Sequence, residues 1–234
     1  MILTAFAKAL GQLGDPRFRR VLILGLALTI ALLFAVYALV LIAISWLTGD
    51  AVTLPLVGEV RWLDDLLGWS SLVAMMIMSI FLMVPVASAI TSLFLEDVAA
   101  AVEARHYPAL PPVAPMPWSD ALRDTAGFLG VLIGANLLAL ILYIALPFGA
   151  FAIFWGLNGY LLGREYFQLA AMRRLGRAGA QDLRRRHWLT VWAAGVLMAI
   201  PLSVPLINLL IPILGAATFT HLVHALRSDP ARTG

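Results

Sequence analysis

Hydrophobic and polar residues follow one another along this chain in long blocks, preceded by one short amphipathic stretch. In residues 2–13 the apolar residues recur every three or four positions, with Thr4, Lys8 and Gln12 on the opposite side. This spacing is typical of an amphipathic helix that lies at the boundary between lipid and water. The pattern therefore predicts an N-terminal interfacial helix.

Two long apolar blocks predict helices that cross a membrane. Residues 21–47 form a run of 27 and residues 66–95 a run of 30. A hydrocarbon core requires roughly 20 helical residues. Pro85 interrupts the second run, but a proline can kink a membrane helix without ending it. We therefore expect two long transmembrane helices.

Two further apolar blocks are interrupted, and their pieces are short. Residues 127–163 are broken at Pro147-Phe148-Gly149, and residues 189–226 by prolines 201, 205 and 212. Most of the resulting legs hold 14 to 16 residues, which reach only ~21–24 Å into a core of about 30 Å. We expect two hemi-penetrating helical hairpins. Partly inserted backbone must be covered by protein or line a water-filled cavity, which predicts a homo-oligomer, a pore-like cavity, or both.

Composition and charge turn this pattern into a topology. The chain is 62% hydrophobic and only 12% charged, with a mean hydropathy of +0.94, whereas soluble domains carry about 25% charged residues. Seven arginines lie in the basic segment 164–188. If each hairpin returns to the side it enters from, fifteen of the sixteen basic residues are cytoplasmic and only Arg61 is outside. This predicts a single all-α membrane domain over residues 1–234, with both termini cytoplasmic.

The sequence lacks the usual signatures of catalysis and cofactor binding. The chain has no cysteine, no P-loop, no H-E-x-x-H, no G-x-S-x-G and no Rossmann glycine run. His221 and His224 lie three residues apart, but no neighbouring ligand completes a metal site. The basic helix expected at 171–186 lacks the aromatic residues that stack bases, so membrane lipids are its expected partner and not nucleic acid. We expect neither an enzyme nor a cofactor.

The best candidate for a binding site is the cluster of Arg17, Arg19 and Arg20 before the first long helix. Its simplest interpretation is a positive-inside anchor. The alternative is an anion site, because guanidinium forks suit tetrahedral oxyanions and a helix N-terminus favours negative charge. Both interpretations stay open at this point.

A second group of polar residues could line a path or hold the fold. Glycines 156, 159 and 163 permit close helix packing, while Asn158, Arg164 and Glu165 place polar groups at or near the membrane boundary. Glu103, with Glu96 and Arg105, follows the second long block and could pair with the basic segment. We expect a structural network there, with gating as the alternative, and we expect His106 to be solvated.

The string Asn158-Gly159-Tyr160-Leu161-Leu162-Gly163-Arg164-Glu165-Tyr166 resembles the signature of the CysZ-type sulfate permease family, which is grouped with the etoposide-induced-protein-like membrane proteins. Weaker similarities occur at residues 16–20, 94–103, 205–209 and 215–217. The resemblance implies two long membrane helices with two hemi-penetrating hairpins, an oligomer, and sulfate uptake that supports cysteine biosynthesis.

The resemblance also implies an anion site in the loop before the first long helix, built from backbone N–H groups and arginines. Arg19 and Arg20 match that pattern, whereas Arg17 and Phe18 stand where the family has Gly and Leu. We expect Arg17, Phe18, Arg19 and Arg20 to bind the anion, with Arg17 compensating for the missing glycine or selecting a different anion. The main hypothesis is an anion permease for sulfate or a related oxyanion. The alternative is a non-transporting membrane scaffold or accessory protein of the same fold.

Overall fold

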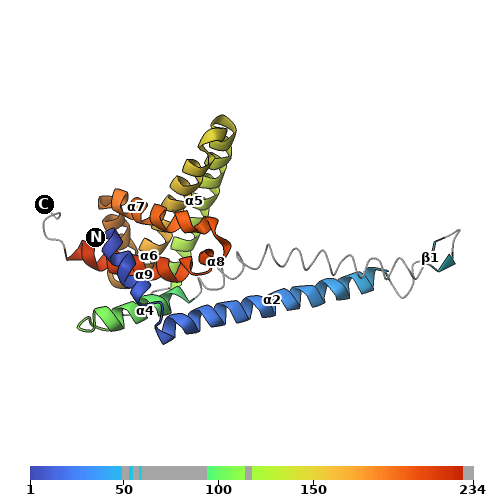
Figure 1. The fold of residues 1–234 in the computed structure, drawn as a ribbon, viewed down its shortest axis with the longest axis horizontal. Helices are drawn as coiled ribbons and strands as arrows, with labels where there is room; N and C mark the ends of the chain where they lie inside the picture. Colours follow the sequence, from blue (N-terminus) through green and yellow to red (C-terminus); the bar gives the residue numbers. More distant parts are fainter. Residues whose placement is uncertain (49–52, 55–57, 60–93, 114–117, 229–234) are drawn as a thin grey trace. The chain divides into compact units, whose positions relative to one another are not determined.

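A computed structural model describes residues 1–48, 53–54, 58–59, 94–113 and 118–228 (Figure 1). The span expected at 66–95 lies outside the described residues, apart from its last two positions. The chain forms two compact units. One joins Met1–Leu22 to Ser92–Gly234, and the other is Ile23–Thr91.

Helix α2, Pro16–Thr48, begins in the first unit and provides the described part of the span expected at 21–47. Pro16 stands at the first helical position, where its missing N–H is no loss. Oδ1 of Asp15 accepts the N–H of Arg17 at 2.9 Å, which caps the helix. Residues Pro16–Leu39 are long and apolar enough to cross a membrane. In the second unit, β1 (Thr53–Leu54) and β2 (Gly58–Glu59) pair antiparallel.

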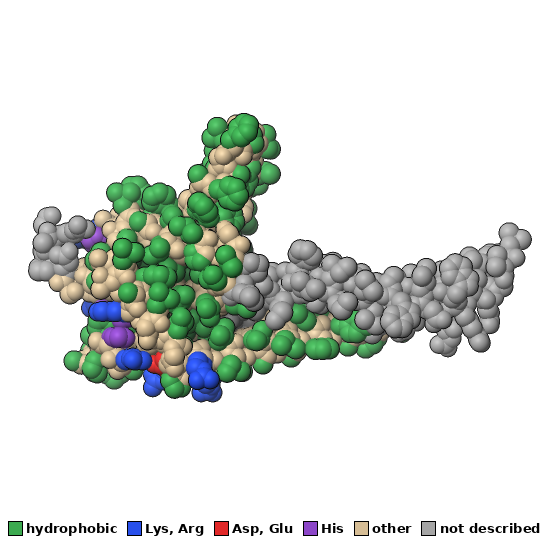
Figure 2. Space-filling view, in the orientation of Figure 1, with side chains coloured by type: hydrophobic (Ala, Val, Ile, Leu, Met, Phe, Trp, Pro, Cys, Tyr) green, Lys and Arg blue, Asp and Glu red, His purple; other side chains and the backbone are tan. Residues whose placement is uncertain are grey.

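In the first unit, α5 (Trp118–Ala145) and α6 (Ala150–Arg186) pack side by side as a hairpin, joined by the 3-10 turn η1 (Pro147–Gly149) (Figure 1). The break predicted at Pro147-Phe148-Gly149 is confirmed. In α5, Ala126–Ala145 is the second described helix long and apolar enough to cross a membrane. Hydrophobic side chains cover the far end of this hairpin, where Phe148 is fully exposed (Figure 2).

The second leg of that hairpin is longer than the sequence pattern indicated. Helix α6 continues through Arg164 to Arg186 and bends at Gly176, where φ is 65°. The expected 16-residue leg ended at Gly163 because apolar character ends there. A change from apolar to polar residues does not end a helix, however, because arginine and glutamate are good helix formers. How deeply the hairpin inserts remains a prediction.

The remaining helices pack around α9 (Ile211–Arg227), in which fifteen of seventeen residues are buried and which therefore forms the centre of the unit. Helices α1 (Ile2–Gly11), α4 (Leu95–His106) and α6 contact it. Before it come α7 (Trp188–Ala199), the 3-10 turn η2 (Ile200–Ser203) and α8 (Pro205–Asn208). Prolines 201, 205 and 212 each stand at the start of one of these pieces, as the predicted breaks required.

Helix α1 is amphipathic as predicted, but part of its apolar face packs against protein. Ala9 is fully buried, and Ile2 and Phe6 pack on the core. Leu3 and Leu10 are exposed and remain available to a membrane surface. The interfacial position of α1 therefore stays a prediction, and only Leu3 and Leu10 could contact the membrane surface.

Glycines allow α6 and α7 to approach at backbone distance. A Cβ on Gly159 would lie 2.8 Å from the backbone of Val196, and one on Gly163 would lie 2.6 Å from the Val191 carbonyl oxygen. On α7, a Cβ on Gly195 would collide with the carbonyl of Gly159. Gly156 has open space instead. The packing role predicted for this glycine series is thus confirmed at Gly159 and Gly163.

Candidate functional site

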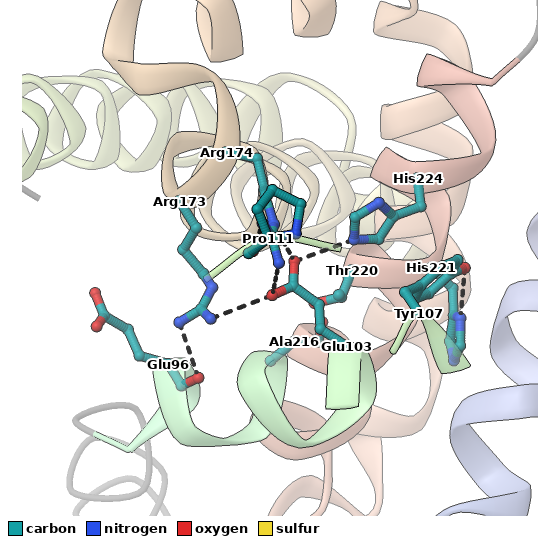
Figure 3. A network of polar contacts seen from close by, with 10 residues as sticks. All are labelled: Glu96, Glu103, Tyr107, Pro111, Arg173, Arg174, Ala216, Thr220, His221 and His224. Carbon is teal, nitrogen blue, oxygen red and sulfur yellow. Dashed lines mark hydrogen bonds and ion pairs between the residues drawn. The ribbon is translucent and has the colours of Figure 1, made fainter. Parts of the chain in front are cut away.

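The most connected polar group in the described residues is the carboxylate of Glu103, which joins three helices (Figure 3). It lies on α4 and its side chain is only 7% exposed. From α6, Nε and Nη2 of Arg174 donate to its two oxygens at 2.9 Å each, and Nη2 of Arg173 donates at 3.4 Å. From α9, Nε2 of His224 lies 3.1 Å from Oε1. We call these four residues the Glu103 cluster.

The two arginines also hold the ends of neighbouring segments. Nη1 of Arg173 donates to the carbonyl of Glu96 at 3.2 Å, and Nη1 of Arg174 donates to the carbonyl of Pro111 at 2.6 Å (Figure 3). Each guanidinium therefore bridges a buried carboxylate and a backbone oxygen. The cluster fixes the start of α4, its C-terminal half and the proline-rich connector against α6.

The electrostatics of the cluster keep Glu103 ionised. Burial raises the pKa of this carboxyl group, but the hydrogen bonds from His224 and Arg174 and the charges of both arginines lower the pKa to about 2. An ionised carboxylate only accepts hydrogen bonds, so the His224 Nε2–H donates to it. The pairing of Glu103 with the basic segment was predicted from the sequence and is confirmed.

A second polar layer, formed by aromatic rings, lies beside the cluster. The Tyr107 hydroxyl is 3.0 Å from Nδ1 of His221, and the ring of Tyr107 lies 4.2 Å from that of His224. The His106 ring packs edge-on against His221 at 4.7 Å, and its Nε2 is buried. The His106 side chain is half-buried, because the fold of α4 turns it toward α9, so the expectation that His106 is solvated holds for only part of the ring. No group of three metal-ligating side chains occurs in the part of the chain that the structure describes.

The arginines before the first long helix have a different environment. Arg17, Arg19 and Arg20 are exposed at the start of α2, and no ion pair involves them among the described residues. The side chain of Phe18, between them, is 1% exposed and belongs to the hydrophobic core. Only the backbone of Phe18 can therefore face an anion.

Asp15 limits what the helix N-terminus itself can offer to an anion. Its carboxylate accepts the Arg17 N–H, receives Nε2 of Gln12 at 3.1 Å and lies 3.9 Å from Nη1 of Arg105. A carboxylate thus occupies one backbone donor of the first turn. An anion bound here would depend on the three guanidinium groups more than on backbone N–H groups.

The structure does not gather the remaining candidates, Asn158, Arg164, Glu165 and Glu103, into one site. Asn158 donates to the Phe154 carbonyl of its own helix at 2.8 Å. The Arg164 guanidinium lies over the Phe128 ring at 5.2 Å. Burial raises the pKa of Glu165 more than adjacent Arg164 lowers it. No hydrogen bond or ion pair joins Glu103 to any of these three residues within the described ranges.

Two partners in these contacts escaped the sequence analysis. His224 lies 121 positions from Glu103, and no local pattern connects them. Gly195 had a weak signal, because a small residue within an apolar helix often marks close packing, but nothing identified Gly159 as the backbone it would meet.

The comparison with known families now identifies the class of the chain. Residues 5–212 match the family described as sulfate transporter CysZ/etoposide-induced protein 2.4. The chain belongs to this family. Among curated proteins, none is significantly similar to it. The predicted resemblance is confirmed. The family and the apolar helices indicate a membrane protein, and the family includes sulfate transporters as well as etoposide-induced proteins.

Proposed function

We propose that this chain is a permease for sulfate or a related oxyanion in a bacterial inner membrane, and that it supplies sulfur assimilation and cysteine biosynthesis. Family membership over residues 5–212 supports the substrate class. The observation that carries the proposal is the set of three exposed arginines, 17, 19 and 20, at the start of the long apolar helix α2. The permease uses no cofactor and catalyses no covalent chemistry.

In this proposal Arg19 and Arg20 capture the anion with their guanidinium forks. Such forks bind tetrahedral oxyanions through paired, charge-assisted hydrogen bonds. Arg17 supplies a third cation in place of the family glycine. Phe18 holds the loop by inserting its side chain in the core, so that the two flanking arginines stay exposed on either side of a fixed point.

The translocation path in this proposal runs past Asn158, Arg164 and Glu165. Arg164 and Glu165 lie where the apolar part of α6 ends, and the half-buried carboxyl of Glu165 is near a cation. Glu103 acts on transport only by holding α4, α6 and α9 together, which is the structural role rather than the gating role. Its two arginines are already committed to it.

The membrane arrangement that we propose keeps the predicted topology. Residues 21–47 and 66–95 cross the bilayer, residues 127–163 and 189–226 insert as hairpins, and residues 2–13 rest at the interface through Leu3 and Leu10. Both termini are cytoplasmic. Lipids and further copies of the chain in a homo-oligomer cover the exposed apolar side chains of the α5–α6 hairpin.

Sulfate uptake into proteoliposomes tests this function. Vesicles that contain the protein should accumulate radiolabelled sulfate faster than protein-free vesicles, and unlabelled sulfate should compete. The Arg19→Ala/Arg20→Ala variant should lose most of this flux while remaining folded. Flux that the double substitution leaves unchanged contradicts the site. No flux in any vesicle contradicts the permease and favours the scaffold alternative, especially if a stoichiometric protein partner co-purifies.

A further inference from the structure

At the polar end of the α5–α6 hairpin, arginines from three positions along α6 lie near one another. Nε of Arg177 lies 3.9 Å from Oδ1 of Asp124, near the start of α5. The guanidinium of Arg164 rests on Phe128, and its Nη2 would be 3.8 Å from a Cβ added to Gly127. The first turns of α5 therefore contact arginines on both sides of the α6 bend.

The bend at Gly176 adds a third arginine. Residues 164 and 184 would be about 30 Å apart on a straight helix. After the bend, Arg184 is close enough to Arg164 and Asp124 for their charges to act on it. Burial and the charge of Arg164 lower the pKa of Arg184. Gly176 has a φ of 65°, a conformation that glycine adopts without strain.

Positive charge exceeds negative charge at this place. The interacting groups are four guanidinium groups and two carboxylates, which leaves two positive charges over within the described residues: Arg164, Arg177, Arg184 and Arg185 against Asp124 and Glu165. Arginine does not lose its proton in proteins, so the repulsion cannot be relieved by titration. The Nε atoms of Arg177 and Arg184 are buried and have no hydrogen-bond partner in the described part of the chain.

We propose that Arg164, Arg177 and Arg184 form a cradle for one tetrahedral oxyanion. Like charges gathered at one place attract a counter-charge, and guanidinium groups carry forks of donors that suit the oxygens of a phosphate or sulfate group. The three side chains are half-buried, and Arg177 keeps 35% of its side chain exposed. The cradle lies where the apolar, span-length part of α5 begins. In the membrane arrangement proposed above, this is the depth of lipid headgroups. The ligand chemistry is therefore that of a phospholipid phosphate or of free sulfate or phosphate.

This cradle is distinct from the arginines at the start of α2 and does not depend on transport, since a lipid phosphate would fill it in a protein that carried nothing. We would test it by direct binding in the Arg19→Gln/Arg20→Gln background, so that the proposed transport site does not contribute. Calorimetry measures the binding of sodium sulfate and sodium phosphate in 150 mM chloride, where the Debye length is roughly 8 Å. Native mass spectrometry measures the binding of phosphatidylglycerol.

The cradle variant is Arg164→Gln/Arg184→Gln. The control, Arg186→Gln/Arg227→Gln, also removes two arginines, of which Arg186 pairs with Asp182 at the surface. We expect the cradle variant to bind the free anions at least tenfold more weakly, or to lose one phosphatidylglycerol adduct, while the control changes less than twofold. Loss for free anions identifies a solute site, and loss for the lipid alone identifies a headgroup site.

The Arg184→Lys variant provides a second test in case the double variant does not fold, because lysine keeps the positive charge and removes only the planar fork of donors. It should weaken the same binding at least threefold. Binding of sulfate, phosphate and phosphatidylglycerol that neither Arg184→Lys nor the double variant alters overturns the cradle. Arg164 also lies on the proposed translocation path, whereas Arg184 does not. The result for Arg184→Lys, measured as binding and not as sulfate flux, is therefore separate from the outcome of the permease proposal.

Discussion

Two groups of arginines in this protein have the same side chain and opposite environments. Arg173 and Arg174 are 11% exposed and share the buried carboxylate of Glu103. Arg17, Arg19 and Arg20 are exposed around a buried Phe18 and have no ion pair among the described residues. The arginines of the first group pair within the protein, whereas those of the second group are exposed and can bind a solute.

The difference shows that a count of basic residues does not identify an anion site. The seven arginines of segment 164–188 are the larger cluster in the sequence, yet two of them, Arg173 and Arg174, are already paired with the carboxylate of Glu103. Removing a residue from the first group should therefore cost stability, whereas removing one from the second should cost binding.

The largest effect should come from Glu103→Ala. This substitution leaves two buried guanidinium groups without their counter-charge, and breaking a buried pair typically costs about 3–5 kcal/mol. We expect the free energy of unfolding in detergent to fall by that amount. The control is Glu96→Ala, which removes an exposed carboxylate and keeps the backbone oxygen that Arg173 uses. A loss below about 1 kcal/mol would show that the cluster is not structural.

Acid should reverse the same interaction. The folded-state pKa of Glu103 is about 2, below the ordinary value of 4.5 for a glutamate side chain. A depressed pKa gives stability that is present above the unfolded pKa and is lost as pH falls through the folded pKa. Stability should thus decrease between about pH 5 and pH 2, by on the order of 3 kcal/mol. The melting temperature should fall more steeply with decreasing pH in the wild type than in Glu103→Gln. Parallel profiles would contradict the assignment.

A smaller effect tests whether α6 is held firmly enough to present Arg173 and Arg174. Gly159→Ala forces a Cβ against the backbone of Val196, 2.8 Å away, and overpacking of this kind typically costs about 1–3 kcal/mol. Gly156→Ala, one turn earlier, meets open space and should gain slightly from helix propensity. The two melting temperatures give the comparison directly, and equal values would mean that α7 can shift to accommodate a methyl group.

The smallest expected effect on stability is at the second group. Arg17→Ala, Arg19→Ala and Arg20→Ala should each change the free energy of unfolding by less than about 0.5 kcal/mol, as is usual for exposed side chains without partners. Chemical denaturation in detergent measures this. A loss of more than about 1 kcal/mol at Arg19 or Arg20 would place that residue with the structural arginines.

Much of the fold was predictable because prolines and polarity mark it. The breaks at Pro147-Phe148-Gly149 and at Pro201 follow from the geometry of proline, and Glu103 was expected to meet the basic segment. The continuity of α6 was not predictable, because Arg164 ends the apolar block without ending the helix, whereas the end of α6 at Arg186 agrees with the basic helix expected at 171–186. His224 was not predictable as a partner of Glu103, because only the packing of α4 on α9 brings them together.

The candidate anion site was predictable in its residues but not in its mechanism. Three arginines at a helix start suggest backbone N–H groups that assist them. The structure shows Asp15 on the Arg17 N–H instead, and it shows the Phe18 side chain in the core. Whether a capping carboxylate or a bound anion occupies a helix N-terminus depends on loop geometry, which the residue types alone do not specify.

The most direct test of the division between the two groups is to measure sulfate uptake and melting temperature on the same preparations of two variants. Arg19→Ala/Arg20→Ala should keep the wild-type melting temperature and lose most of its sulfate flux. Glu103→Gln should melt at a lower temperature and keep its flux per folded molecule when uptake is measured below that melting point. The opposite result, with flux lost in folded Glu103→Gln and retained in Arg19→Ala/Arg20→Ala, would contradict the account.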